Sequence, residues 1–303
     1  MADGGGDVND MFWAIASAPP SHQTGGDDSL SLSSLVPLQD DFEADLLARL
    51  APSGGCAAGA PAADARNRYD VGGIYVKVYE NGENGCLSTI GTEVWDAAVL
   101  FCFLFSEEAS GVAAFLRTSF PAGGRSARVL ELGSGVGLSG CFLKTVMGGG
   151  IDLTMTDYSP EVIRLLLRSA SLLGEGVNVR VLDWYREETY GGGGGEGEGG
   201  AGTAGPLYDC VVGTALVYSP SHSVVADVIN ATLSPAGKAF ILQLSTRPGV
   251  KEFLARCEAL DLEVKVEEVG ESVVERARVC RKKEGIGGSE EMRVYTITHG
   301  RGS

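Results

Sequence analysis

One short segment of the chain combines an acidic residue with closely spaced glycines. It reads RVLELGSGVGLSG from Arg128 to Gly140, so Glu131 precedes glycines at positions 133, 135 and 137. A strand, a glycine turn and a helix start in this order allow the backbone to approach a bound nucleotide. Counted from Gly133, the dinucleotide fingerprint G-x-G-x-x-G does not fit, because Leu138 stands where its third glycine belongs. A tight turn without any ligand is the alternative interpretation.

Two further acidic positions follow strand-like runs. Asp157 ends LTMTD and can either accept the two hydroxyls of a ribose or cap the following helix. Asp183 and Trp184 end VNVRVLDW, where an acid can accept an exocyclic amine and an indole can cover an adenine. Core packing is the alternative for Trp184. Because open α/β sheets bind ligands at the carboxyl ends of their strands, these residues and the glycine turn together favour a nucleoside site.

The character of the turn narrows the choice of nucleoside. The phosphate-binding loop G-x-x-x-x-G-K-[ST] is absent, and the turn contains no lysine or arginine to meet a phosphate. A nucleoside without phosphates that carries an amino-acid tail fits better, which predicts S-adenosylmethionine as the cofactor. Glu131 would then orient the ammonium of that tail, directly or through water.

The surrounding elements predict the sheet that positions these residues. Strand-like runs alternate with helical stretches, which is typical of a doubly wound, mostly parallel sheet. The expected strands are 127–132, 151–157, 177–184, 207–213 and 238–245, followed by 262–269 and 291–299. The last two are joined by RARVCRKKEGIGG, with no helical crossover expected, so they are predicted to pair antiparallel at the sheet edge. Before the sheet, 69–82 predicts a hairpin with Asn81–Gly82 as its turn, and 91–105 predicts a buried helix.

Composition divides the chain into an arm and a domain. Residues 1–68 are acidic and poor in large apolar residues, so we expect a largely disordered arm with one amphipathic helix near 40–50. The domain spans 69–303 and contains a flexible insertion at 191–205, where ten of fifteen residues are glycine. The seven cysteines show no CxxC spacing, which predicts reduced thiols and no zinc site.

Charge and hydropathy limit the partners. A net charge of −16 argues against a protein whose overall field attracts nucleic acid, while basic protein partners remain open. The acidic N-terminus does not fit a signal peptide, and the apolar piece after it is too short for a membrane span. Acidic residues bracket the apolar run AAVLFCFLF, which is interpreted as a buried helix. We therefore expect no membrane partner and a cytoplasmic or nuclear protein, monomeric by default.

Several motifs in order resemble the seven-strand S-adenosylmethionine-dependent methyltransferases, and more closely the eukaryotic protein lysine methyltransferases of methyltransferase family 16. They are STIGTEVWDAA, ELGSGVGLSG, TDYSP, LDWY, YDCVVGTALVY and LQLSTRPGVKEFLARCEALDLEV. The resemblance covers roughly 69–299 and implies a Rossmann-like seven-stranded sheet with an antiparallel last strand. It implies cofactor contacts at Trp95, Gly133, Ser134, Gly135, Asp157, Asp183, Trp184 and Thr214.

One position departs from the family pattern. The family follows its fourth strand with an acid, two residues and a tyrosine, whereas this chain has Ala215 before Tyr218. Tyr218 is expected to orient the acceptor, with packing at a strand end as the alternative. A lysine acceptor must lose a proton from an amine of pKa about 10.4, and a nearby carboxylate would raise that pKa. We therefore interpret the missing acid as an orienting group rather than a base.

Three functions remain open at this stage. The first is methyl transfer to a protein side chain, with lysine as the expected acceptor. The second, prompted by Ala215, is a catalytically silent scaffold that binds S-adenosylmethionine, and the third is a small-molecule methyltransferase. His222 follows the Tyr218 motif and is interpreted as a solvated loop histidine, with a base at the acceptor site as the alternative. The basic residues 276–283 are expected in a solvated hairpin loop.

Overall fold

The computed structural model describes residues 65–80, 90–107, 110–121, 123–190, 207–281 and 291–300. The chain divides into two units after Ser53, and all described residues belong to the second. The helix expected near 40–50 and the insertion at 191–205 lie outside the described residues.

Nine strands form two sheets in the described part of the chain. The strands are β1 (Ala65–Val71), β2 (Ile74–Glu80), β3 (Ala127–Leu132), β4 (Ile151–Asp157), β5 (Val177–Val181), β6 (Tyr208–Thr214), β7 (Leu233–Leu244), β8 (Leu262–Glu268) and β9 (Met292–His299). β1 and β2 form a hairpin, and the others form one sheet in the order β5-β4-β3-β6-β7-β9-β8. Neighbours from β5 to β7 are parallel, whereas β9 is antiparallel to both β7 and β8. The predicted mostly parallel sheet with an antiparallel last strand is therefore confirmed.

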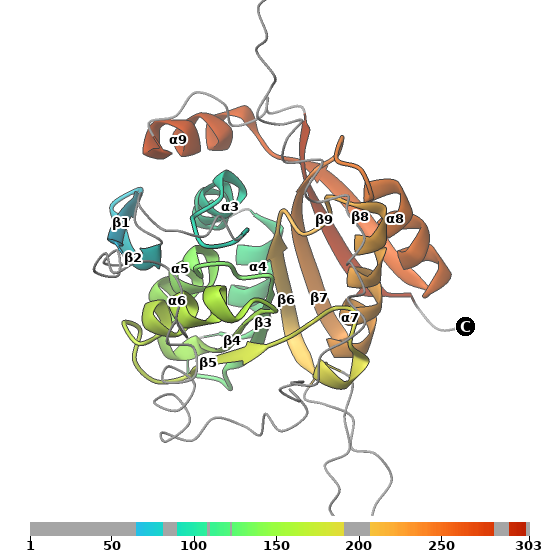
Figure 1. The fold of residues 1–303 in the computed structure, drawn as a ribbon, viewed down its shortest axis with the longest axis horizontal. Helices are drawn as coiled ribbons and strands as arrows, with labels where there is room; N and C mark the ends of the chain where they lie inside the picture. Colours follow the sequence, from blue (N-terminus) through green and yellow to red (C-terminus); the bar gives the residue numbers. More distant parts are fainter. Residues whose placement is uncertain are drawn as a thin grey trace, which may run out of the picture. The chain divides into compact units, whose positions relative to one another are not determined.

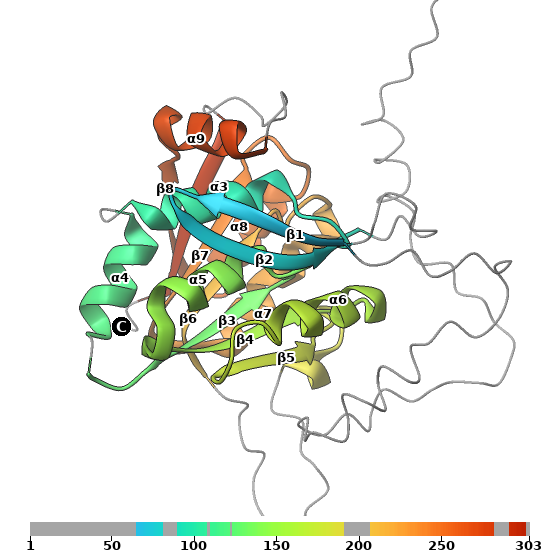
Figure 2. The same ribbon diagram turned by 90° about the vertical axis from the view of Figure 1, so that its left-hand side faces the viewer.

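Helices cover both faces of this sheet. The α-helices are α3 (Asp96–Ser106), α4 (Gly111–Ser119), α5 (Leu138–Met147), α6 (Pro160–Ala170), α7 (Val225–Thr232), α8 (Val250–Ala259) and α9 (Glu271–Arg281). α3, α5 and α6 lie on one side with the hairpin packed on α5 and α6, and α7 and α8 lie on the other (Figures 1 and 2). The connection between α5 and β4 contains one short 3-10 helix, η2 (Gly148–Gly150).

The predicted buried helix is confirmed as α3. Its buried residues lie on all sides of the helix, from Ala97 through Phe101 to Phe105. A helix that is apolar nearly all round is stable only inside a core, where α5 and α9 pack against it. Among the described residues no single helix is long and apolar enough to span a membrane, and α3 and α4 pass that test only together across a 53° bend.

The hairpin turn differs from our prediction. Val71 pairs with Ile74, so the chain turns at Gly72–Gly73, and the expected turn at Asn81–Gly82 lies outside the described residues. Gly72 has φ +60° and Gly73 φ +91°, the positive values that both central residues of a type I′ turn require. The first strand accordingly begins at Ala65, before the predicted domain start at 69.

The connection between β8 and β9 also differs from our prediction, because it contains α9. Val273, Val274 and Ala277 of this helix are buried, and the helix packs against α3. Arg276 forms an ion pair with Glu107 across that contact. The basic residues of this segment predicted a solvated loop, whereas its small apolar residues form a helix that packs on α3.

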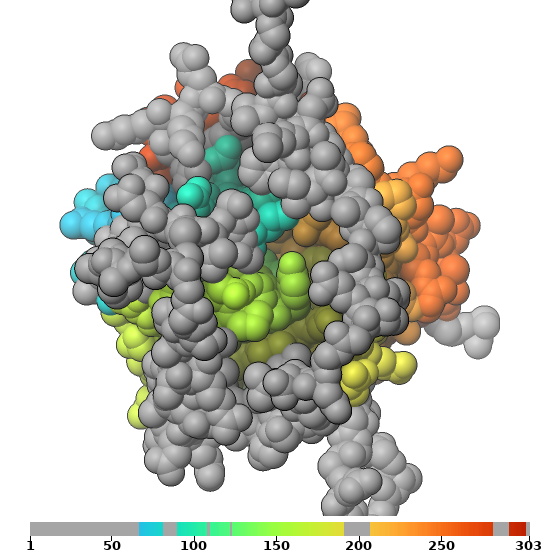
Figure 3. Space-filling model, viewed as in Figure 1, coloured from blue at the N-terminus to red at the C-terminus, as the bar shows by residue number. Residues whose placement is uncertain are grey.

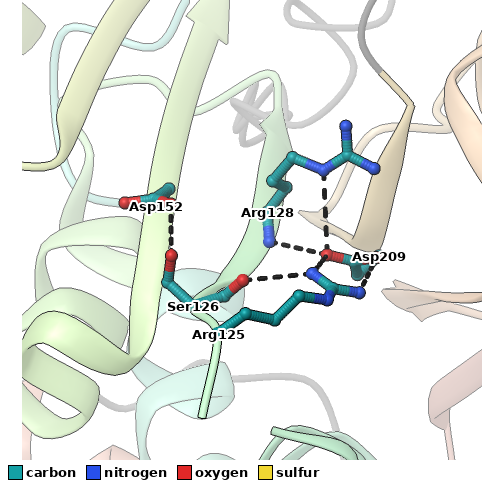
Figure 4. Close-up of polar contacts among 5 residues, drawn as sticks. All are labelled: Arg125, Ser126, Arg128, Asp152 and Asp209. Carbon is teal, nitrogen blue, oxygen red and sulfur yellow. Dashed lines mark hydrogen bonds and ion pairs between the residues drawn. The ribbon is translucent and has the colours of Figure 1, made fainter. Parts of the chain in front are cut away.

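A polar cluster holds the amino-terminal ends of β3 and β6 together (Figure 4). The Asp209 carboxylate accepts hydrogen bonds from Arg125 Nη1 and Nη2 at 2.7 and 2.9 Å. It also accepts the Arg128 amide at 2.9 Å. Ser126 donates to Asp152 of β4 beside this pair. The cluster lies at the edge of the sheet opposite to the predicted cofactor site, so we assign it to stability.

We expect Asp209→Asn to lower the free energy of unfolding by about 1–3 kcal/mol at pH 7, because it weakens bonds to a buried carboxylate. Burial alone would raise the pKa of Asp209, but the bonds from Arg125 and the Arg128 amide lower it below 3.8. The contribution is therefore present above pH 4 and is lost as the pH falls below 3.8. Urea unfolding at pH 7 and pH 3 measures this; Asp152→Asn, at an exposed site, is the control. An equal loss in both variants would contradict the assignment.

Candidate active site

The predicted glycine turn follows β3 and requires glycine for two separate reasons. Gly133, Gly135 and Gly137 have φ values of +56°, +54° and +88°, in the left-handed region that side chains disfavour. A Cβ atom on Gly133 would lie 2.8 Å from Leu216 Cδ2 and 3.3 Å from Trp184 Cζ2. The turn therefore lies in contact with the residues that follow β5 and β6.

Glu131 is the most unusual group in this site. Its side chain is buried, Oε1 accepts the Gly140 amide at 3.2 Å, and Oε2 has no hydrogen-bond partner among the described residues. Burial raises the pKa of Glu131 to about 7, against hydrogen bonds that favour the carboxylate. A sealed, unpartnered carboxylate oxygen beside the glycine turn fits a ligand that brings an ammonium group to it.

Asp157 and Ser134 connect the turn to β4. The Asp157 carboxylate accepts the amides of Gly135 at 3.1 Å, Tyr158 at 2.8 Å and Ser159 at 3.1 Å. Burial raises its pKa despite these bonds. Ser134 Oγ accepts the Thr156 amide at 3.0 Å, so this side chain links two strands. Asp157 thus shapes the turn as well as being available to a ribose.

β5 ends at Val181, earlier than the expected end at Trp184. Asp183 and Trp184 therefore lie in the segment that follows the strand. The Asp183 carboxylate accepts the Tyr185 amide at 3.0 Å and lies 3.6 Å from Arg186 Nε. Its contact with an adenine stays a prediction. Trp184 lies against Gly133 and also packs against the hydrophobic core, as the alternative interpretation expected. Its contact with an adenine stays a prediction as well.

Trp95 is positioned by a contact that the sequence analysis missed. Buried Glu80 of β2 accepts the Val94 amide at 2.8 Å, as well as Asn67 Nδ2 and the Tyr69 hydroxyl. This ties the segment before α3 to the hairpin. In the same segment, the Gly91 carbonyl lies 3.2 Å from where a Cβ on Gly135 would be, so the segment lies against the glycine turn.

Residues 215–218, which we name the acceptor lip, follow β6 and Thr214. Ala215 has φ +53°, and its amide donates to the Leu242 carbonyl at 2.9 Å. The side chain of buried Gln243 in β7 forms two hydrogen bonds with the backbone of Val217: it accepts the amide at 3.0 Å and donates to the carbonyl at 2.7 Å. The lip is therefore held rigidly, although the family acid is absent.

Tyr218 ends the lip among other aromatic groups. Its ring centroid lies 4.1 Å from that of His222, which in turn lies 5.5 Å from that of Trp184. Burial raises the pKa of Tyr218 to about 12, and the nearby Tyr158, Asp157 and Tyr185 add to the shift while Arg247 opposes it. Arg247, after β7, lies 5.7 Å from the Trp95 ring centroid.

The structure thus brings together the ends of five strands at one edge of the sheet. Glu131, Gly133, Ser134, Gly135, Asp157, Asp183, Trp184, Thr214 and Tyr218 lie at or just after the carboxyl ends of β3, β4, β5 and β6, and Trp95 lies in the segment before α3. In the space-filling view, the green to yellow-green surface of the first half of the sheet and the orange surface of its second half border a hollow (Figure 3).

Sequence analysis missed Glu80, Gln243 and Arg247 and misjudged His222. His222 is buried in the short helix η4 (Pro220–Val224), and is not a solvated loop histidine. Only the polar residues within otherwise apolar strands, Glu80 and Gln243, carried a signal, because a polar side chain at a core position needs a partner.

Part of the chain matches a known protein family. Residues 76–192 match the family model described as lysine methyltransferase. None of the curated proteins compared with the chain matches it. Similar solved structures include a TehB-like SAM-dependent methyltransferase from Corynebacterium glutamicum, at 19% identity and TM-score 0.42, covering 69% of this chain and 90% of that one. Another is phospholethanolamine N-methyltransferase 2 of Haemonchus contortus with S-adenosylhomocysteine, at 12% identity and TM-score 0.43, covering 69% and 61%. These likenesses do not bear on the substrate.

The structure combines a seven-stranded sheet with a glycine turn at the end of β3. This turn lies within residues 76–192, which match the family model described as lysine methyltransferase. The residues that fit the cofactor are the unpartnered Glu131 carboxylate, the glycine turn and Asp157.

Proposed function

We propose that the chain transfers a methyl group from S-adenosylmethionine to a protein side chain, with lysine as the acceptor. The observation that carries the proposal is the match of residues 76–192 to the lysine methyltransferase family. It is supported by a rigid lip that presents Tyr218 beside the cofactor turn. We also propose that the protein acts as a monomer in the cytoplasm or nucleus, without a nucleic-acid or membrane partner.

The residues of this chain would divide the work of binding and alignment. When bound, the cofactor supplies an activated methyl group on a sulfonium. Glu131 would hold the ammonium of the tail, Asp157 the ribose, and Trp184 with Asp183 the adenine, while Trp95 would cover the tail. Tyr218 would orient the acceptor nitrogen by a hydrogen bond. Alignment and exclusion of water are the main requirements, because the donor is already activated.

The experiment is transfer of labelled methyl groups from S-adenosylmethionine into a protein extract of the source organism, followed by hydrolysis to identify the modified amino acid. Extract without added enzyme and extract with the Asp157→Ala protein are the blanks. Gly133→Arg is a poor blank, because a side chain there must displace Leu216 and Trp184. Labelled methyl-lysine supports the proposal; label only in small molecules favours a small-molecule methyltransferase.

Ala215 favours a second candidate, a scaffold that binds the cofactor without transferring methyl groups. The family acid is missing, and no carboxylate of the described lip replaces it. Protein that binds S-adenosylhomocysteine but labels neither protein nor metabolite would make this candidate the better one.

We expect Asp157→Ala to weaken binding of S-adenosylhomocysteine by about 1–3 kcal/mol, or roughly 5- to 150-fold, because it leaves polar partners unsatisfied. Adenosine should lose affinity equally, since it carries the same ribose. Isothermal calorimetry measures both, and Asp152→Ala, near the other end of β4, is the control. Unchanged affinity in a variant that still melts cooperatively would show that Asp157 does not hold the ribose.

A further inference from the structure

His222 is the group beside the acceptor lip that the proposed function leaves unused. It is buried, and Nδ1 lies 2.9 Å from the Leu216 carbonyl. Because a carbonyl oxygen only accepts hydrogen bonds, Nδ1 carries the hydrogen and the neutral ring has its lone pair on Nε2. The lip itself therefore selects the tautomer of His222.

The lone pair of His222 is available to a bound molecule. Nε2 has no hydrogen-bond partner among the residues that the structure describes. The ring lies between Tyr218 and Trp184, at the border of the acceptor and adenine positions.

The surrounding charges favour a neutral acceptor nitrogen. The lip carries Ala215 where the family has an acid, and Arg247 has no ion pair with a described carboxylate. The Arg247 cation near Tyr218 and burial both lower the pKa of an amine placed there, against the Asp157 carboxylate, which also acts on Tyr218 and favours an ammonium. A weak base is then sufficient to accept the one proton that the nitrogen loses on methylation.

The other titratable groups near His222 do not compete for this role. Tyr218 has a pKa of about 12, and the Tyr185 hydroxyl contacts Ser221 Oγ at 3.1 Å. On the helices packed against η4, Asp227 of α7 is paired with Arg256 of α8. Burial lowers the pKa of His222, against the bond to Leu216, so the ring is neutral at pH 7.

We propose that His222 Nε2 is the proton acceptor for the acceptor amine. The inference rests on the proposed function. The lone pair of the neutral amine forms the new nitrogen–carbon bond, and the resulting methylammonium passes one proton to Nε2. The carbon–sulfur bond breaks with its electron pair left on sulfur, which gives S-adenosylhomocysteine. The imidazolium then returns its proton to water.

Two substitutions separate this role from a purely structural one. His222→Asn keeps an N–H at the position of Nδ1 for the Leu216 carbonyl but removes Nε2, whereas His222→Gln carries its amide at the Nε2 position and loses the Nδ1 donor. Both should lose at least about 100-fold in kcat for labelling of extract protein. The decrease in rate below pH 6.5 should disappear in the Asn variant, while its melting temperature and its affinity for S-adenosylhomocysteine stay unchanged.

The matched control is His299→Gln, which keeps a donor for the Leu233 carbonyl that His299 Nε2 contacts at 3.1 Å and leaves the site untouched. An Asn variant that retains kcat within about threefold would overturn the proposal and leave His222 as a positioning residue for the lip.

A second measurement does not depend on turnover. In the S-adenosylhomocysteine complex, the imidazole nitrogens of His222 are followed by NMR while n-butylamine is added. A change at Nε2 that is absent in the Asp157→Ala protein supports the assignment, and no change at saturating amine overturns it. Protein that shows this change yet labels nothing would count against the proposed function and not against the contact.

Discussion

Glu131→Gln should weaken binding of S-adenosylhomocysteine by about 10- to 100-fold while leaving 5′-methylthioadenosine unaffected. The reason is that Oε2 is sealed and unpartnered among the described residues, and a hydrogen bond to a charged group contributes about 1.5–3 kcal/mol. 5′-Methylthioadenosine has the same nucleoside but no ammonium. Calorimetry with both ligands on both proteins measures the difference directly.

The same substitution should stabilise the protein without ligand. The pKa of Glu131 is about 7 in the folded protein against an ordinary value of 4.5 for a glutamate, so the folded state retains the proton to higher pH than the unfolded state does. Stability of the wild type therefore falls as pH rises from 4.5 to 7, by roughly 3 kcal/mol in total. Glutamine removes this cost, so the variant should be the more stable protein at pH 8 and gain nothing below pH 4.5.

The opposite signs of these two effects distinguish a binding group from a structural one. Affinity of the wild type for S-adenosylhomocysteine should also rise between pH 5.5 and 7, because binding requires Glu131 ionised, and this rise should be absent in the glutamine variant. Thermal unfolding at pH 5 and pH 8 completes the test. A variant that is less stable at pH 8 and binds S-adenosylhomocysteine normally would show that Glu131 has no ligand role.

Gly249→Ala should cost roughly 3 kcal/mol or more of unfolding free energy, the largest loss that we expect from adding one methyl group. Gly249 precedes α8 with φ +93°, and a Cβ there would lie 2.1 Å from the Ser219 carbonyl oxygen and 2.4 Å from its carbon. Backbone cannot rotate away as a side chain can, so the lip beside Tyr218 must shift. Chemical unfolding measures the loss.

Gly174→Ala is the matched control for this change. Gly174 has φ +79° but no atom within 4 Å of its added Cβ, so it carries the conformational cost alone, about 1–2 kcal/mol. The difference between the two variants isolates the close contact with Ser219. Equal losses in both would mean that α8 and the lip separate at little cost.

The sequence by itself determined the seven strands of the main sheet and the edge at which the predicted site residues lie. Apolar runs such as 127–132 and 151–157 predict buried parallel strands, and carboxyl ends of parallel strands meet at one edge. Asp157 and the glycine turn could therefore be assigned to one site without knowing any contact between them. Positive φ at Gly133 and Gly135 is likewise a local property that residue type reveals.

Only the tertiary structure decided the state of the individual side chains. Three such properties depend on segments that are distant in sequence and pack together only in the folded chain. They are the pKa of Glu131, the burial of His222 and the two hydrogen bonds between Gln243 and Val217. The helix α9 was not predicted for a related reason: its three buried residues are covered only because the helix packs against α3. Local sequence patterns specify the backbone conformation of an element and which of its faces is apolar. The desolvation and the hydrogen-bond partners of a side chain depend instead on which elements pack together in the fold.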